Sequence, residues 1–280
     1  MAQTAVTAPD LSIPSMIAPA YFGPNAFPVP DMLDGRTSGC LSVELCGDTF
    51  LCTMTQSMTD DMTYDLFAKV RVPLFSEKVN LVLWMPVLEY FRSSPEINAL
   101  RRTDADGWTS GWDSGDVYVS TDIMILEQSR AGFDMAVRAA LKTASGNSYA
   151  AARVYDSPGY FFDLSAGREL VNSGGGTDLS LRAAVSAGFL CWQTDNGRQN
   201  DAVMYGASIA AAKNRFSAKM ALGGYIGWEG AGDSPLTLKT ELSYGLGQFA
   251  LIVSHQAGFM DWPFHQFRFG VSYTFPAMLK

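Results

Sequence analysis

Long apolar runs are absent from this sequence, and so is any basic character. A bilayer-spanning helix needs roughly 18 uninterrupted apolar residues, whereas the longest evident apolar run, Leu81 to Leu88, is interrupted by Pro86. The sequence therefore excludes a helical membrane span. The formal net charge of −8 also argues against nucleic acid as a partner, because proteins that bind it carry a basic stripe.

Histidine and cysteine are scarce, with two and four residues respectively. Their spacing matches no metal-binding motif, so we expect no metal centre and no cofactor. The cysteines are interpreted as small apolar residues. An oxidising compartment leaves open one disulfide among Cys40, Cys46 and Cys52, and the state of Cys191 is equally open.

Aspartates gather in one polar stretch, where Asp104, Asp106 and Asp113 have the carboxylate density of a calcium-binding loop. The closing glutamate of the EF-hand pattern is missing, so these are weak metal candidates and a solvated acidic loop is the preferred interpretation. The neighbouring Trp108 and Trp112 are candidates for contact with lipopolysaccharide or a partner protein.

Catalytic motifs are also absent. The sequence has no Gly-Xaa-Ser-Xaa-Gly elbow, phosphate loop or His-Glu metal motif. His255 and His265 fall on an outward-facing parity, and the adjacent Ser254 points to the opposite face, which argues against a serine–histidine pair. We expect no catalytic residues and no enzyme activity.

The sequence is instead rich in glycine and aromatic residues, with 26 glycines, 12% aromatic and only 17% charged residues. Apolar residues recur with a period of two in about a dozen segments, joined by alternately short and long connections. This pattern predicts an all-β, antiparallel up-and-down barrel of about twelve strands. The segments are 41–46, 64–72, 79–85, 117–125, 133–141, 160–165, 181–189, 203–209, 216–226, 236–243, 249–253 and 267–275.

Two alternatives remain open at this level. Residues 133–144 and 207–221 are rich enough in alanine to favour helices by propensity, which would give a mixed fold. The same alternation also fits a soluble β-sandwich or a lipocalin-like barrel. Repetition of the pattern in about a dozen segments favours the membrane barrel.

The last strand alternates aromatic or apolar side chains with small or polar ones and ends on Phe275. Through Phe269, Val271, Tyr273 and Phe275 it resembles the closing strand of outer-membrane β-barrel proteins of Gram-negative bacteria. The resemblance implies a transmembrane barrel in the bacterial cell outer membrane, with the bilayer and lipopolysaccharide as its surroundings.

Two regions are predicted. Residues 1–38 contain six of the thirteen prolines together with many apolar side chains, which indicates an extended arm or plug that must dock against something. Residues 39–280 form the transmembrane barrel.

With the apolar positions facing lipid, the opposite parity places eight basic and six acidic side chains in the lumen. A charged wall selects ions and polar solutes, so we expect passage or binding of small polar solutes, with a weak anion preference. The alternative to solute passage is a structural function, in which the protein is a structural or assembly subunit that binds another envelope protein through its arm or loops. The lumen-facing candidates are Glu44, Asp65, Lys69, Arg71, Asp122, Asp134, Arg138, Lys142, Asp163, Arg182, Lys219, Lys239, Glu241 and Arg268.

Overall fold

The computed structural model describes residues 39–50, 62–74, 78–95, 108–146, 158–171, 179–193, 199–228, 234–260 and 264–275. The predicted arm (1–38), Cys52, Asp104 and Asp106 lie outside these residues. Strands dominate the described part. They are β1 (Gly39–Phe50), β2 (Met62–Pro73), β3 (Val79–Arg92), β4 (Ser110–Asp113), β5 (Tyr118–Leu126), β6 (Asp134–Lys142), β7 (Gly159–Val171), β8 (Leu179–Gln193), β9 (Gln199–Lys213), β10 (Phe216–Gly227), β11 (Leu236–Leu246), β12 (Phe249–Met260) and β13 (Phe264–Phe275), with one short helix, α3 (Gln128–Ala131).

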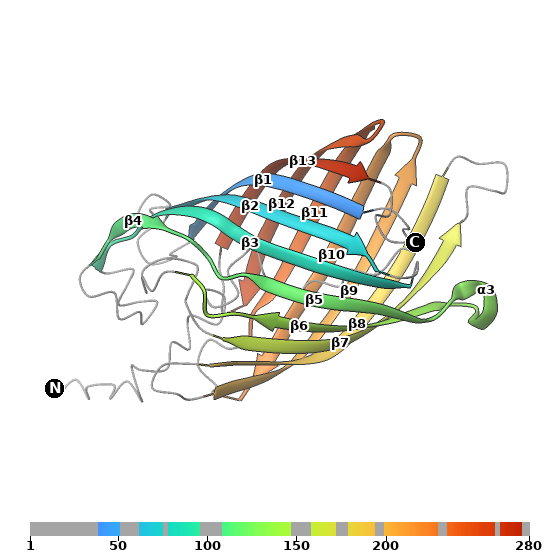
Figure 1. The fold of residues 1–280 in the computed structure, drawn as a ribbon, viewed down its shortest axis with the longest axis horizontal. Coiled ribbons are helices and arrows are strands. Elements are labelled where there is room, and N and C mark those ends of the chain that lie inside the picture. Colours follow the sequence, from blue (N-terminus) through green and yellow to red (C-terminus); the bar gives the residue numbers. More distant parts are fainter. Residues whose placement is uncertain are drawn as a thin grey trace.

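The strands close into a barrel (Figure 1). Each barrel strand is antiparallel to the next along the chain, and β13 pairs with β1 over the full length of both, from Gly39 opposite Phe275 to Phe50 opposite Phe264. Twelve strands form the closed ring, and β4 is an extra strand. The prediction of an all-β, twelve-stranded up-and-down barrel is confirmed.

Strand β3 has two different neighbours on one side. Its first half pairs with β5 from Val79 to Trp84, and its last four residues, Glu89–Arg92, pair with β4. On its other side the ladder with β2 shifts register after Pro86, where a bulge leaves Val87 without a partner in that ladder. Proline removes an amide donor, and bulges are among the places in a sheet that tolerate it. Figure 1 shows β4 at the end of the barrel opposite α3.

The helical alternative for residues 133–144 and 207–221 is wrong. The first segment is mainly strand β6. The second continues β9, turns at Asn214 and Arg215, and enters β10. Asn214 adopts the left-handed region with φ 55°, which asparagine tolerates in a tight turn. Pairing of both strand edges outweighs the helix propensity of alanine, which is below 1 kcal/mol per residue.

The outer surface of the barrel is apolar and exposed, while the inner surface is buried and carries most of the strands' polar and charged side chains together with apolar ones such as Phe161 and Leu190. Leu45, Phe216 and Phe269 are each more than 60% exposed. Alternate residues on the same strands, such as Glu44 and Arg268, are less than 10% exposed. An exposed apolar belt around a closed barrel with a polar interior fits a bilayer environment, since lipid covers the belt.

Among the described residues, no helix is long and apolar enough to cross a bilayer.

Aromatic side chains border the apolar belt at both ends. At the short-turn end Phe216 packs on Tyr244 with ring centroids 4.7 Å apart, and Phe249 packs on Tyr273 at 5.0 Å. At the loop end Tyr64, Tyr90 and Trp112 are opposite one another in the β2–β3–β4 register. Aromatic girdles of this kind mark the two membrane–water interfaces of outer-membrane barrels.

The closed ladder generates the first prediction. Because no strand edge is available from which the ring can open, the purified protein in detergent should show a strand-dominated circular dichroism spectrum. Unboiled protein should also migrate differently from boiled protein on gels. A helix-rich spectrum, or a stable detergent-free soluble monomer, would contradict the membrane barrel.

Candidate functional site

The inner wall of the barrel carries most of the charged and polar side chains of the strands. All fourteen predicted lumen-facing residues lie on strand positions of the inner parity, and none of them is exposed. Neutral polar side chains fill many positions between the charges and are themselves less than 9% exposed. Those neutral residues are Ser42, Thr63, Asn80, Ser120, Ser165, Thr237, Ser254, Gln256 and Gln266.

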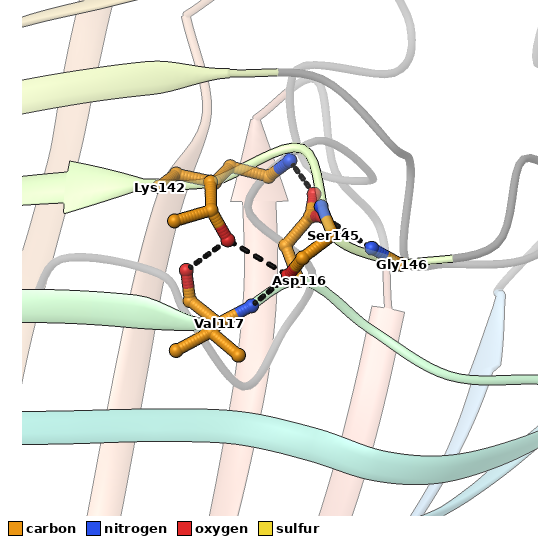
Figure 2. Close-up of polar contacts among 6 residues, drawn as sticks. Asp116, Val117, Lys142, Ser145 and Gly146 are labelled. Carbon is orange, nitrogen blue, oxygen red and sulfur yellow. Dashed lines mark hydrogen bonds and ion pairs between the residues drawn. The ribbon is translucent and has the colours of Figure 1, made fainter.

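A buried ion pair joins the two strands of the β5–β6 hairpin at the loop end. Lys142, the last residue of β6, forms an ion pair with Asp116, and each side chain is only 1% exposed (Figure 2). Asp116 also accepts hydrogen bonds from the backbone N–H groups of Ser145 at 2.6 Å and Gly146 at 2.8 Å. We call Asp116, Lys142, Thr143, Ser145 and Gly146 the loop-end clamp.

The loop-end clamp is completed by hydrogen bonds to Val117. The Thr143 hydroxyl donates to the Val117 carbonyl at 2.8 Å, and the Val117 N–H donates to the Ser145 hydroxyl at 3.1 Å (Figure 2). A Cβ on Gly146 would lie 2.6 Å from the Ser114 carbonyl oxygen, so this approach requires glycine. The clamp therefore fixes the segment entering β5 against the segment leaving β6.

Aromatic rings line the wall beneath the clamp. Trp84 stacks on Tyr118 with centroids 5.1 Å apart, and Trp84 is 6.4 Å from Phe161. Cations lie over two of these rings, Lys142 over Tyr118 and Arg138 over Phe161. The wall here consists of large side chains that are less than 10% exposed, which narrows the interior on this side.

Arg138 on β6 pairs with Asp163 on β7, with 2.7 Å between its Nε and the carboxylate. Asp163 faces Gly188 on β8, where a Cβ would lie 2.7 Å from that of Asp163 and 2.2 Å from the Phe162 carbonyl oxygen. The glycine thus leaves room for the carboxylate and its neighbouring backbone. A charge-assisted hydrogen bond of this length orients the guanidinium along the wall.

A second arginine pair lies across the seam where the barrel closes. Arg268 on β13 lies 3.3 Å from the carboxylate of Glu44 on β1. Its Nε donates a 2.6 Å hydrogen bond to the side-chain oxygen of Gln266, and its guanidinium lies over the Phe67 ring. Gly270 again makes room, since its Cβ would lie 2.5 Å from the Glu44 Cγ. Removing water from this pair strengthens its electrostatic attraction.

At the short-turn end, Arg182 on β8 lies between two carboxylates. Its guanidinium is 2.6 Å from Asp134 and 3.7 Å from Glu169. Asp134 also accepts a hydrogen bond from the Gln128 N–H at the start of α3. On the adjacent turn Lys78 donates a hydrogen bond to Glu127, and this contact lowers the pKa of the Glu127 carboxyl.

The other predicted wall residues are less tightly grouped. Lys239 and Glu241 pair along β11 at 3.2 Å, and Asp122 accepts a hydrogen bond from Ser120 at 3.1 Å. Asp65 is buried opposite Cys46 in the β1–β2 register. The remaining three, Lys69, Arg71 and Lys219, are half-buried on the inner face.

Sequence reasoning missed three acidic wall residues. Glu89 is fully buried opposite Asp65, Asp113 is opposite Glu89, and Glu169 is opposite Arg182. The bulge at Val87 reverses the parity of β3 and turns Glu89 inward; Pro86 was the signal that could have revealed it. With these three, the strand side chains that the structure describes place eight basic and nine acidic groups on the inner wall.

The described cysteines, Cys40, Cys46 and Cys191, form no disulfide with one another. Cys40 and Cys46 lie six residues apart on one strand, about 20 Å at 3.3 Å per residue, so a disulfide between them is geometrically impossible. Asp113, the weak metal candidate that the structure describes, lies in β4 and accepts a hydrogen bond from the Ser114 N–H. The described residues contain no group of three or more potential metal ligands.

The loop-end clamp generates the second prediction. Lys142→Met should destabilise the barrel by about 3 kcal/mol, because it leaves the Asp116 carboxylate buried without its cation. Combining it with Asp116→Leu should cost less than the sum of the two single changes. Urea unfolding in detergent, followed by gel migration, measures each variant.

Lys78→Met is the matched control, since it removes a lysine from a partly exposed ion pair with Glu127. Its effect should be much smaller than that of Lys142→Met. Equal effects of the two lysine substitutions, or strict additivity in the double variant, would show that the clamp pair does not stabilise the fold.

No protein-family model matches the chain, and no curated protein matches it. Among solved structures it resembles the NanC porin, with a TM-score of 0.53 and 10% identity over 82% of this chain and 98% of that one. It also matches the β domain of the Bordetella autotransporter Brka, with a TM-score of 0.49 and 13% identity over 86% of this chain and all of that one. The closed twelve-stranded ring with its exposed apolar belt, together with the likeness to the NanC porin, shows the fold of outer-membrane β-barrel proteins.

Proposed function

We propose that this outer-membrane barrel passes or binds small polar solutes along its inner wall. The observation that carries the proposal is the composition of that wall: neutral amides, hydroxyls and ion pairs lie there beside aromatic and aliphatic side chains, whereas the exposed outer face of the same strands is mainly apolar. A polar lining of this kind offers hydrogen bonds to a hydrated solute at low desolvation cost.

The charges on the inner wall predict a barrel that selects only weakly between anions and cations. Five basic side chains of the wall each have a carboxylate within ion-pairing distance. They are Arg138, Lys142, Arg182, Lys239 and Arg268. With eight basic and nine acidic strand side chains described, and Asp116 as the partner of Lys142, this wall is close to charge balance and does not favour the anion preference expected from the sequence. The narrowing by Trp84 and Phe161 favours small solutes over large ones.

No catalytic role is included in the proposal. The chain's two histidines, His255 and His265, lie on the outer face, and Ser254 is buried on the inner face. The lipid bilayer is the proposed partner of the apolar belt, and lipopolysaccharide of the exposed Trp108 and Trp112 at the loop end.

The third prediction concerns conductance. The protein reconstituted in planar bilayers should give small, steady currents with a reversal potential near zero in a salt gradient. Replacing two wall cations by Arg138→Gln with Arg182→Gln leaves Asp163 and Asp134 uncompensated, so the reversal potential should move toward cation preference.

A matched control makes the same charge change outside the wall. Lys78→Gln with Arg130→Gln removes one cation from the β2–β3 turn and one from α3, where the side chains are 47% and 82% exposed. This control should leave selectivity unchanged. Absence of current from the full-length protein and from a variant lacking residues 2–33 would sink the transport proposal.

The alternative function is a structural or assembly subunit of an envelope complex. Deep burial of the wall favours it, because Tyr225, Gln266 and Glu89 are among the least exposed side chains of the chain and leave little surface for a solute. In this alternative the apolar, proline-rich residues 1–38 or the loops bind another envelope protein.

The fourth prediction separates the two functions. If residues 1–38 obstruct the lumen, deleting residues 2–33 should raise conductance while heat-modifiable migration persists. If they bind a partner, the deletion should leave conductance unchanged and abolish co-purification of that partner from native membranes. A deletion that changes neither quantity would leave this segment as a tether and contradict both roles for it.

A further inference from the structure

The two histidines of the chain lie side by side on the outer face. His255 is on β12 and His265 on β13, and the register that places Ala257 opposite His265 makes them diagonal neighbours. The His255 Nε2 and His265 Nδ1 atoms are 3.0 Å apart. Their rings are nearly parallel, at 12°, with centroids 5.3 Å apart, so the two nitrogens face each other end to end.

The pair lies where the aromatic girdle meets the loop end of the barrel. Phe267 stacks on His255 with ring centroids 4.6 Å apart. Phe267 is opposite Gly47, which is opposite Tyr64, so the histidines share a row with the loop-end aromatic residues. Both imidazoles are half-buried rather than covered. At this level water and lipid phosphates reach the outer face of a barrel.

Neutral imidazoles can rearrange without releasing a proton. In the structure one nitrogen of the pair donates and the other accepts. A change of tautomer places both N–H groups on the far nitrogens, so that two lone pairs face each other. Two facing lone pairs repel, and a cation between them removes that repulsion. The neutral imidazole nitrogen is the commonest protein ligand of transition metals.

The separation of the nitrogens suits one metal ion after a small adjustment. Two nitrogens bound to Zn²⁺ at roughly 2.0–2.1 Å with a tetrahedral angle lie about 3.4 Å apart. The observed distance is 3.0 Å. The rings must also turn so that the lone pairs meet beside the line joining the nitrogens, and both imidazoles are partly exposed on the outer face.

We infer that His255 and His265 form a binding site for a divalent transition-metal ion of the Zn²⁺ type on the outer face of the barrel. The described residues offer no third histidine, cysteine or carboxylate there. The remaining coordination positions are taken by oxygen atoms of water or of lipid phosphate. This site is on the opposite face from the inner wall, so it is independent of solute passage.

The test uses the untagged full-length chain in detergent, titrated with zinc chloride by calorimetry at pH 7.5. One ion should bind per chain with micromolar affinity. Because loss of even an outer-shell partner typically weakens metal binding by 10- to 100-fold, His255→Gln and His265→Gln should each reduce affinity at least about tenfold. Retained heat-modifiable migration shows that each variant is folded.

Cys191→Ser is the control for another residue type that binds zinc, because Cys191 is a described, buried cysteine on another strand, β8. Its affinity for zinc should equal that of the unchanged protein. The inference is overturned if the unchanged protein binds no zinc, if the histidine variants keep full affinity, or if Cys191→Ser abolishes binding. A repeat with barrel reconstituted in phosphatidylglycerol vesicles should give equal or tighter binding, since lipid phosphate can then supply oxygen ligands.

Discussion

A bilayer offers no water to backbone amides and carbonyls, so every strand that crosses it must pair on both edges. In this chain that requirement is met at the seam between β1 and β13, where twelve residue pairs join the two ends of the barrel sequence. The alternation of side chains follows from the closure. Once the ring is complete, each strand has one face toward lipid and one toward the interior, and Phe269 and Arg268 can be neighbours in sequence without sharing an environment.

Charge inside such a ring is stable when it is compensated locally. Arg138, Arg182 and Arg268 each lie within 3.3 Å of a carboxylate from another strand. Glycine at 188 and 270 leaves the space that the paired carboxylates occupy. The ion pairs consequently connect strands in addition to the backbone ladders, and they give the wall a polar character without a large net charge.

The strand pattern and the inner parity could be predicted from the sequence because a period of two is a direct consequence of strand geometry. The closing strand from Phe267 to Phe275 illustrates this. Features that depend on a break in the period could not be predicted this way. The bulge at Val87 turned Glu89 inward, and the four-residue β4 lay inside a stretch that reads as a polar loop. Pairings such as Lys142 with Asp116 depend on register and loop path, which the local pattern does not contain.

The unequal partners of β3 make the described strands reach different heights at the loop end. Beyond Trp84 this strand is no longer joined to β5, and its final residues pair with β2 on one side and with β4 on the other. The wall on that side therefore stands taller than the wall formed by the β5–β6 hairpin, which ends at the clamp. Tyr90 and Trp112 pack on each other there with ring centroids 5.1 Å apart, so the taller part of the wall carries an aromatic pair where the lower part ends in a buried ion pair.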